Sequence, residues 1–378
     1  MGKMGKHKNI KRRNNGNFAP NEIAILGSKC SNIANLVRNI SEKLQKKHKI
    51  AYFDASHDFE KQVPNIDVLT FNKNGFVEKT ALQDENPYNL KIEFSGHDLV
   101  FVNGNHYQAT QQILILDNEK EASVLKRLEQ LDNIQFIIKA TKDAKFFDFL
   151  VEKQPAIKNL KCYEIDEIDT ISNHIENLIQ EKIASVNGLI LIGGKSKRMG
   201  TDKSNLDYHG KPQREYLLDV LGDSITENNI FYSVRDENQL ANETQIITDK
   251  FLDLGPFSGI CSAFMHNPNK AWLVVATDLP FISKEIINLL LSKRNPSKIA
   301  TTFKGKSKNF PEPLITIWEP KAYPILLNYL AQGYSCPRKV LINNDVEIVE
   351  ISDEIIQNVN TKEDLIKLNS KFSSKLFL

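Results

Sequence analysis

The sequence predicts an α/β protein with two domains. Its 378 residues exceed the usual size of one domain. Short apolar segments also alternate with amphipathic segments along most of the chain. A new apolar segment near residue 188 starts a second alternation, which indicates a second domain. We expect a flexible basic tail over residues 1–20, an α/β domain over 21–168, a linker helix over 169–186 and a second α/β domain over 187–378.

Composition and charge exclude several classes of protein. Apolar residues make up 41% and charged residues 25%, as in ordinary globular proteins. No apolar run approaches the 18 residues of a membrane-spanning helix. The net charge is +2, but six basic residues lie in the first 20, and the rest holds 43 basic and 47 acidic residues. An acidic body lacks the basic face that nucleic-acid binding requires, so we expect neither membrane nor nucleic-acid partners.

The four cysteines, Cys30, Cys162, Cys261 and Cys336, stand singly along the chain. Single, widely spaced cysteines are typical of reduced thiols in a cytosol, and they do not form the pairs of a zinc site. We therefore expect a cytoplasmic protein without structural zinc.

The elements of the first domain follow from the spacing of apolar residues. The segment 22–26 is an apolar strand that runs into Gly27, and the next segment carries apolar residues at helical spacing. The strands that we predict cover 22–26, 49–54, 98–102, 112–116 and 135–138. The helices that we predict cover 32–46, 119–131, 144–151 and, as the amphipathic linker, 169–182.

The second domain opens with an apolar strand over 188–192 that delivers the chain into a glycine- and lysine-rich loop. Gly193 and Gly194 allow backbone N–H groups to approach phosphate oxygens closely. The nearby Lys203 and Arg198 offset phosphate charge, and an arginine can bind phosphate bidentately. The spacing is neither GxxxxGK[ST] nor GxGxxG. The loop therefore predicts binding of a nucleoside triphosphate, and a basic surface turn is the alternative.

The order of residues in this loop resembles the signature LAGGxSxRMGxDK of the molybdenum cofactor guanylyltransferases, a branch of the sugar-phosphate-type nucleotidyltransferases. The matching residues are Leu191, Gly193, Gly194, Ser196, Arg198, Met199, Gly200, Asp202 and Lys203. Ile192 departs from the pattern, because the family usually has alanine there, beside the base. The resemblance continues in order through 210–212, 255–260, 272–281, 310–314 and 358–365. It implies a Rossmann-like nucleotidyltransferase three-layer sandwich.

The resemblance also implies roles for single residues. Lys203 would contact the triphosphate, Arg198 the departing pyrophosphate, and Asp278 would bind Mg²⁺, which prefers carboxylate and phosphate oxygens. The other nucleotide contacts implied are Leu191, Ile192, Gly193, Gly194, Ser196, Ser233 and Asp249. Asn358 and Asn360 would lie on the acceptor side.

Simpler interpretations of these residues stay open. Asp278 could cap a helix, and so could Asn358 and Asn360. Asp253 competes with Asp249 for the nucleotide contact. In-line attack on the α-phosphorus requires no nucleophilic side chain, and His209 is expected to be a surface residue.

The first half bears a limited resemblance to the P-loop GTP-binding adaptor of molybdopterin-guanine dinucleotide synthesis. If Gly27 is the first glycine of GxxxxGK[ST], then Asn32, Ile33 and Ala34 fall where Gly, Lys and Ser or Thr belong. We therefore expect a P-loop-like α/β domain with a degenerate P-loop that docks a partner or the acceptor. An unrelated α/β domain is the alternative.

These resemblances imply transfer of GMP from GTP to molybdopterin or the molybdenum cofactor, with Mg²⁺ as cofactor and release of pyrophosphate. Apo-molybdoenzymes or their chaperones would be further partners. Because Ile192 and Ser233 depart from the family pattern, a related nucleotidyltransferase that uses CTP or another acceptor stays an alternative. The degenerate first domain keeps a non-catalytic cofactor carrier open.

Overall fold

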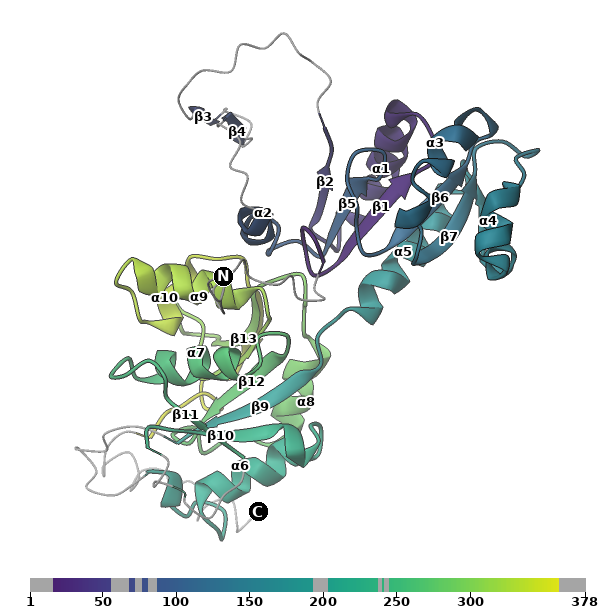
Figure 1. Ribbon diagram of the computed structural model, residues 1–378. Helices are drawn as coiled ribbons and strands as arrows, with labels where there is room; N and C mark the ends of the chain where they lie inside the picture. The colour runs from purple at the N-terminus through teal and green to yellow at the C-terminus, as the bar shows by residue number, and fades with distance from the viewer. Residues whose placement is uncertain are drawn as a thin grey trace, which may run out of the picture. The chain divides into compact units, whose positions relative to one another are not determined.

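The computed structural model describes residues 16–55, 68–71, 77–80, 87–192, 203–236, 240 and 245–359 (Figure 1). Most of the predicted basic tail lies outside these residues. The chain divides into two compact units, Met1–Lys182 and Ile183–Leu378. Each unit carries its own sheet, so the predicted class of two α/β domains is confirmed. Among the described helices, none combines the length and apolar character needed to cross a bilayer.

The first unit is built on a six-stranded sheet in the order β2-β5-β1-β6-β7-β8, in which every neighbouring pair is parallel. Its strands are β1 (Glu22–Leu26), β2 (Ile50–Phe53), β5 (Leu99–Asn103), β6 (Gln112–Leu116), β7 (Ile134–Lys139) and β8 (Cys162–Glu164). Every residue of β1, β5 and β6 is buried, because both faces of the sheet are covered. The five predicted strands agree with these bounds to within one residue, and β8 was not predicted.

Two amphipathic helices, α1 (Cys30–Leu44) and α5 (Ile168–Glu181), cover one face of this sheet. Their apolar stripes form one core cluster with alternate residues of the strands, including Ile33 and Ile40 from α1 and Ile171 and Ile175 from α5. The segment predicted as a linker helix therefore packs within the first unit, and the boundary between the units follows it.

The opposite face carries α3 (Glu121–Leu125), α4 (Asp148–Lys153) and the 3₁₀ turns η1 (Asn118–Lys120), η2 (Leu128–Gln130) and η3 (Pro155–Asn159). The single helix predicted over 119–131 is wrong, because the chain forms three short pieces there. The Arg127 guanidinium donates to the Ser123 carbonyl at 3.0 Å, and the Arg127 N–H turns to Val124 instead. The helical hydrogen-bond ladder breaks at this point.

The segment between β2 and β5 was not assigned from the sequence. It holds an antiparallel hairpin of β3 (Val68–Phe71) and β4 (Val77–Thr80), followed by the short helix α2 (Pro87–Glu93). The Phe71 and Leu69 side chains are exposed, so this hairpin adds little to the core.

The turn after β1 is short and closed by its own contacts. Only three residues separate β1 from α1, whereas the phosphate-binding pattern GxxxxGK[ST] spans eight. Gly27 has φ +96°, and a Cβ there would lie 2.2 Å from the Ile115 carbonyl oxygen. The Ser28 hydroxyl donates to Asp117, which follows β6, at 3.0 Å. This turn lacks the length and the groups of a phosphate-binding loop.

The second unit has a seven-stranded sheet in the order β11-β10-β9-β12-β14-β13-β15. Neighbours from β11 to β12 are parallel, β14 is antiparallel to β12 and β13, and β15 is parallel to β13. The strands are β9 (Val186–Leu191), β10 (Ile230–Val234), β11 (Ile246–Thr248), β12 (Ala271–Ala276), β13 (Ala300–Gly305), β14 (Ile315–Trp318) and β15 (Glu347–Ile351).

Helices cover both faces of this sheet (Figure 1). One face carries α6 (Gln213–Gly222) and α8 (Lys284–Ser292), and the other carries α7 (Pro256–His266), α9 (Ala322–Ala331) and α10 (Pro337–Ile342). The 3₁₀ turns η4 (Lys203–Asn205) and η5 (Glu227–Asn229) flank α6. Successive β12 residues such as Leu273 and Val274 enter opposite core clusters. The predicted three-layer sandwich is confirmed.

Candidate functional site

Four parallel strands of the second unit end at one edge of the sheet. Leu191 closes β9, Ser233 lies one residue from the end of β10, and Asp249 and Asp278 follow β11 and β12. Ligands of open α/β sheets bind at the carboxyl ends of such strands. The topology therefore brings four of the predicted site residues to one edge.

The loop that follows β9 falls outside the described residues. The predicted site residues Gly193, Gly194, Ser196 and Arg198 lie there, and Asn360 also lies outside the described residues. Lys203 opens η4, but only its backbone is described. The predicted roles of these residues stay predictions.

Ser233 and Asp249 form a polar pair beneath the N-terminus of α7. The Ser233 hydroxyl donates to Asp249 Oδ1 at 3.3 Å. Burial raises the pKa of the Asp249 carboxyl, and the hydroxyls of Ser258 and Ser233 oppose that shift. A Cβ added at Gly259 would lie 2.5 Å from the Ser233 hydroxyl oxygen, so glycine lets α7 approach this pair.

Asp253, the alternative to Asp249, occupies a different environment. Its side chain is 76% exposed and pairs with Arg235 at 2.9 Å. Asp249 is the aspartate that lies against Ser233 at the strand ends.

Ile192 does not project into the opening at the strand ends. Its side chain is 4% exposed and belongs to the core cluster beneath α6. Its N–H donates to the Ser233 carbonyl at 3.2 Å, and the Leu191 carbonyl accepts from the Thr277 hydroxyl at 3.3 Å. The larger side chain in place of the family's alanine therefore fills the core.

Asp278 connects the strand ends to the last described segment of the chain. Asn358 Nδ2 donates to Asp278 Oδ2 at 3.3 Å, and the Val359 N–H donates to the Asp278 carbonyl at 2.9 Å. The pKa of Tyr208 is raised to about 12, mainly because the phenol is buried and also because the Asp278 carboxylate lies nearby. Asp278 thus contacts a residue that the sequence assigned to the acceptor side.

The turn after Asp278 is held by three polar side chains of α6 and the turn before it. His209 Nε2 donates to the Pro280 carbonyl at 2.8 Å, and its ring stacks on Tyr216 with centroids 3.7 Å apart. Tyr216 donates to the carbonyl of Ile282 at 3.1 Å, and Gln213 donates to that of Leu279 at 3.3 Å. Burial lowers the pKa of His209.

His209 was predicted to be a surface residue; its side chain is half-buried and bonded to the Pro280 carbonyl. The sequence carries one signal for the stacking of His209 on Tyr216, because the two aromatic residues lie only seven positions apart, across the start of α6. Nothing in the sequence indicates the Pro280 carbonyl as the partner.

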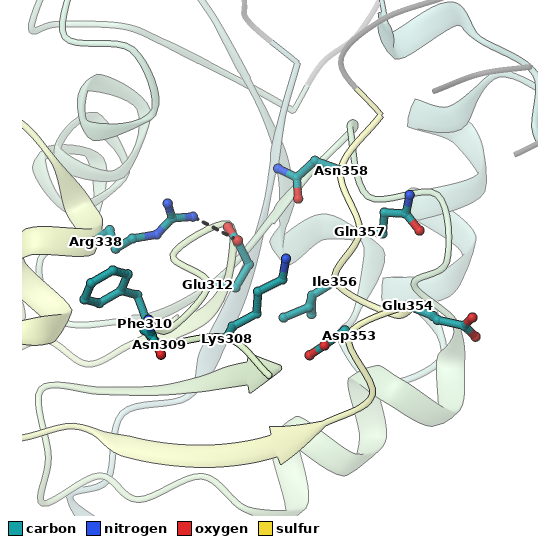
Figure 2. A pocket seen from close by; sticks show the side chains of 10 residues that line it. All are labelled: Lys308, Asn309, Phe310, Glu312, Arg338, Asp353, Glu354, Ile356, Gln357 and Asn358. Atoms are coloured by element: carbon teal, nitrogen blue, oxygen red, sulfur yellow. Dashed lines mark hydrogen bonds and ion pairs between the residues drawn. The ribbon is translucent and has the colours of Figure 1, made fainter. Parts of the chain in front are cut away.

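A pocket of about 520 Å³ lies in the second unit, and Asn358 is one of the residues that line it (Figure 2). Pockets of this size hold small molecules. It is lined by Lys308, Asn309, Phe310, Glu312, Arg338, Asp353, Glu354, Ile356, Gln357 and Asn358. Asn358 lines this pocket and also bonds Asp278, so one residue links the pocket to the strand ends.

The pocket combines an ion pair with an aromatic ring. Arg338 Nη2 lies 3.1 Å from Glu312 Oε2, and Arg338 also donates to the Pro311 carbonyl at 3.2 Å (Figure 2). The Phe310 side chain is 54% exposed. Burial raises the pKa of Glu312, Arg338 lowers it, and Asp278 raises it. The sequence indicated segment 310–314 but not the pairing with Arg338.

Asp278 offers a carboxylate of the kind that Mg²⁺ prefers, although no three His, Cys, Asp or Glu side chains in the described part of the chain are placed to hold a metal ion. Mg²⁺ binds one or two carboxylates and completes its octahedral shell with substrate phosphates and water. Asp278 supplies a carboxylate, and the Glu312 carboxylate lies near enough for each to disfavour the charge of the other. A bound cation would relieve that repulsion, so Asp278 would hold the ion.

Residues 188–347 match the family described as MobA-like NTP transferase domain. The chain is 30% identical over 186 residues to a Synechocystis protein named molybdenum cofactor biosynthesis bifunctional protein; the match covers 48% of this chain and 53% of that protein. It is 32% identical over 162 residues to a protein of Clostridium perfringens strain 13 named probable molybdenum cofactor guanylyltransferase. That match covers 43% of this chain and 74% of the relative. The chain thus spans about half the length of the Synechocystis relative.

Two solved structures resemble the halves of the chain. Molybdopterin-guanine dinucleotide biosynthesis protein A from Archaeoglobus fulgidus aligns with a TM-score of 0.42 and 23% identity, over 50% of this chain and 99% of its own. Molybdopterin-guanine biosynthesis protein B aligns with a TM-score of 0.31 and 14% identity, over 42% of this chain and 99% of its own. The family assignment rests on the sequence relatives.

The second unit is therefore a nucleotidyltransferase-type α/β domain, in which parallel strand ends bring carboxylates together beside a small-molecule pocket. Through this unit the chain belongs to the MobA-like NTP transferase family.

Proposed function

We propose that the chain transfers GMP from GTP to molybdopterin or the molybdenum cofactor and releases pyrophosphate. The observation that carries this proposal is the hydrogen bond between Asn358 and Asp278, which joins the strand ends to the pocket. A nucleotide at the strand ends and an acceptor in the pocket would then meet at Asp278. The names of the relatives, which mention the molybdenum cofactor and guanylyl transfer, support this choice of substrates.

The residues of the site divide the work of such a transfer. Lys203 and Arg198 bind the triphosphate and the departing pyrophosphate. Ser233 and Asp249 orient the nucleoside, and Asp249 can accept hydrogen bonds from ribose or base. Asp278 holds Mg²⁺, which neutralises charge on the transferring phosphoryl group when it is bound.

The pocket suits an acceptor that carries a phosphate and a flat heterocycle. Arg338 and Lys308 provide positive charge for the phosphate, and arginine matches its oxygens bidentately. The exposed Phe310 ring offers a stacking surface. An acceptor phosphate oxygen then attacks the α-phosphorus in line with the leaving pyrophosphate, so positioning supplies most of the rate.

Guanine remains the favoured base. Ile192 supported the alternative of a cytidylyltransferase, because a larger side chain could narrow the base pocket. The Ile192 side chain is buried under α6, which weakens that argument. Ser233 still replaces the amide that the family commonly uses. Single, widely spaced cysteines favour a cytoplasmic location for this reaction.

The test is nucleotide binding and turnover by the full chain. Thermal unfolding is measured with Mg²⁺ and GTP, CTP, ATP or UTP, each at about 100 times its dissociation constant, where one ligand adds about 2.7 kcal/mol. Pyrophosphate release is then measured with molybdopterin. We expect stabilisation and release with GTP alone. A response to CTP alone would change the product, and no response to any nucleotide would favour a cofactor carrier.

A further inference from the structure

A second group of reactive side chains lies in the first unit, next to the closed turn between β1 and α1. Cys30 is the first residue of α1, Asp54 follows β2 and His106 follows β5. All three come from the carboxyl edge of the parallel sheet, on the side where β2 and β5 pair. None of them takes part in the proposed nucleotidyl transfer.

Two side-chain nitrogen atoms lie beside the sulfur of Cys30. His106 Nε2 is 3.2 Å from Sγ, and Asn105 Nδ2 is 3.6 Å from it. Cys30 also begins a 15-residue helix with no acidic residue in its first turn. The partial positive charge of a helix N-terminus favours an anion at this position. The Asn105 amide and the helix N-terminus stabilise negative charge on the sulfur, and His106 Nε2 lies where it can accept the thiol proton.

Asp54 is a second neighbour of the His106 ring. His106 Nε2 lies 4.0 Å from Asp54 Oδ1, and Asp54 Oδ2 accepts a hydrogen bond from the Tyr52 hydroxyl at 2.7 Å. Burial and then this hydrogen bond raise the pKa of Tyr52, so the phenol stays protonated and anchors the carboxylate. Lys29, which precedes Cys30 in the chain, pairs with Glu119 at 3.2 Å.

An independent observation indicates that this edge receives a polar molecule. Asn103 is fully buried, and its Nδ2 meets no hydrogen-bond partner among the described residues, although it lies beside the Tyr52 hydroxyl. Its Oδ1 accepts from the Asn105 N–H at 3.0 Å, which fixes the orientation of the amide. A polar group bound at this edge would satisfy that donor.

The geometry argues against two other uses of these residues. A hydrolase triad needs the carboxylate on Nδ1 of the histidine that activates the cysteine, and here Cys30 and Asp54 both approach Nε2. No three His, Cys, Asp or Glu side chains among the described residues are placed to hold a metal ion. The arrangement fits a thiol that is activated by a neighbouring base.

We propose that Cys30 exchanges with low-molecular-weight disulfides, with His106 as its proton acceptor and donor. The thiol proton moves to His106 Nε2 as Sγ attacks one sulfur of the disulfide. A bond forms between Sγ and that sulfur, and the original S–S bond breaks. The released thiolate takes the proton back from His106 and leaves as a thiol. Cys30 ends oxidised as a mixed disulfide, one half of the small disulfide is reduced, and no other reactant is needed.

The full chain contains its own reference thiols. Cys336 and Cys162 are exposed, and burial raises the pKa of the Cys162 thiol. Cys261 is buried, and burial raises the pKa of its thiol to about 12. The probe is oxidised glutathione at pH 7, and peptide mass spectrometry measures the rate of mixed-disulfide formation at each cysteine.

We expect Cys30 to react about tenfold faster than Cys336, although it is less exposed. An ordinary cysteine is only a few per cent thiolate at pH 7, so an adjacent base leaves room for such a gain. Part of the gain is offset because a less basic sulfur is a weaker nucleophile. A Cys30 rate equal to or below that of Cys336 would overturn the proposal.

His106→Gln tests the role of the imidazole. The variant should lower the Cys30 rate to that of Cys336 and move its pH–rate profile to higher pH. The matched control is His97→Gln, which changes a histidine of the same unit that contacts Phe94, with ring centroids 5.8 Å apart. If both profiles stay as in the wild type, His106 has no such role. The wild-type ratio of Cys30 to Cys336 decides the proposal if His106→Gln fails to fold.

Discussion

The two units end their parallel strands in the same way, but they use the groups there differently. In the first unit, polar groups at the carboxyl ends of β1 and β6 bind one another: the Ser28 hydroxyl bonds Asp117, and Lys29 pairs with Glu119. In the second unit, Asp249 accepts a hydrogen bond from the Ser233 hydroxyl, and Asp278 accepts one from the Asn358 amide. The cations that would meet a triphosphate lie instead in the loop after β9.

This difference shows how one architecture can keep or lose a nucleotide site. Three residues between β1 and α1 bring the helix close and fill the crevice with side chains. In the second unit, the sequence places glycines, Arg198 and Lys203 after β9, and we propose that these residues bind the triphosphate.

The largest effect that we predict is loss of transfer in Asp278→Asn. Removing the carboxylate that holds Mg²⁺ should lower kcat for pyrophosphate release about 1,000-fold, as loss of a preorganised charge does in other transferases and hydrolases. Asp253→Asn is the matched control, because Asp253 is exposed and pairs with Arg235. Equal activity in the two variants would remove Asp278 from the site.

A substitution at Gly27 should strain the closed turn of the first unit and lower its stability. In Gly27→Ala the new Cβ meets the Ile115 carbonyl in a positive-φ conformation, so unfolding of the first unit should become easier by about 3 kcal/mol. The control is Gly333→Ala, where φ is +83° but no atom lies within 4 Å of the added Cβ, and about 1 kcal/mol is expected. Denaturant unfolding measures both. Similar losses in the two variants would show that the tight contact is unimportant.

The acceptor pocket should respond to loss of Arg338. Arg338→Met should raise the KM for molybdopterin about tenfold, the size of one lost charge-assisted hydrogen bond, and change the KM for GTP less. Because Arg338 lowers the pKa of Glu312, the variant should also take up a proton at higher pH. Lys339→Met is the control, since Lys339 lies over the Tyr334 ring. An unchanged acceptor KM would place the acceptor elsewhere.

The smallest effect concerns His209 and pH. Burial lowers its pKa, so the unfolded chain takes up a proton near pH 6.5 while the folded chain stays neutral. Stability should therefore fall as the pH drops below about 6.5, until the native imidazole is also protonated. His209→Gln should remove this contribution, which we expect to be about 2 °C or less in Tm. A variant that keeps the full pH dependence would contradict this assignment.

The pattern of apolar residues along the sequence made much of the fold predictable. The strands over 22–26 and 112–116 have the predicted bounds because continuous apolar runs become doubly covered parallel strands. The helix over 119–131 failed because Arg127 takes the Ser123 carbonyl, a side-chain contact that no apolar spacing reveals. The hairpin of β3 and β4 was missed for a related reason, since its exposed side chains carry no burial pattern.

Prediction of the site depended on local motifs. Asp278 and Asn358 were each assigned from their own motif, but their hydrogen bond joins residues 80 positions apart. The pairing of Arg338 with Glu312 and of His209 with the Pro280 carbonyl also depends on tertiary packing. Local sequence shows which residue types are present, and only the fold shows which of them meet.

The number of GTP molecules bound per chain tests the central contrast most directly. Isothermal titration of the full chain with GTP and Mg²⁺ should give one site, and Asp278→Asn should weaken that site while Ser28→Ala leaves it unchanged. Two sites per chain, or one site that persists unchanged in Asp278→Asn and is lost in Ser28→Ala, would contradict the account.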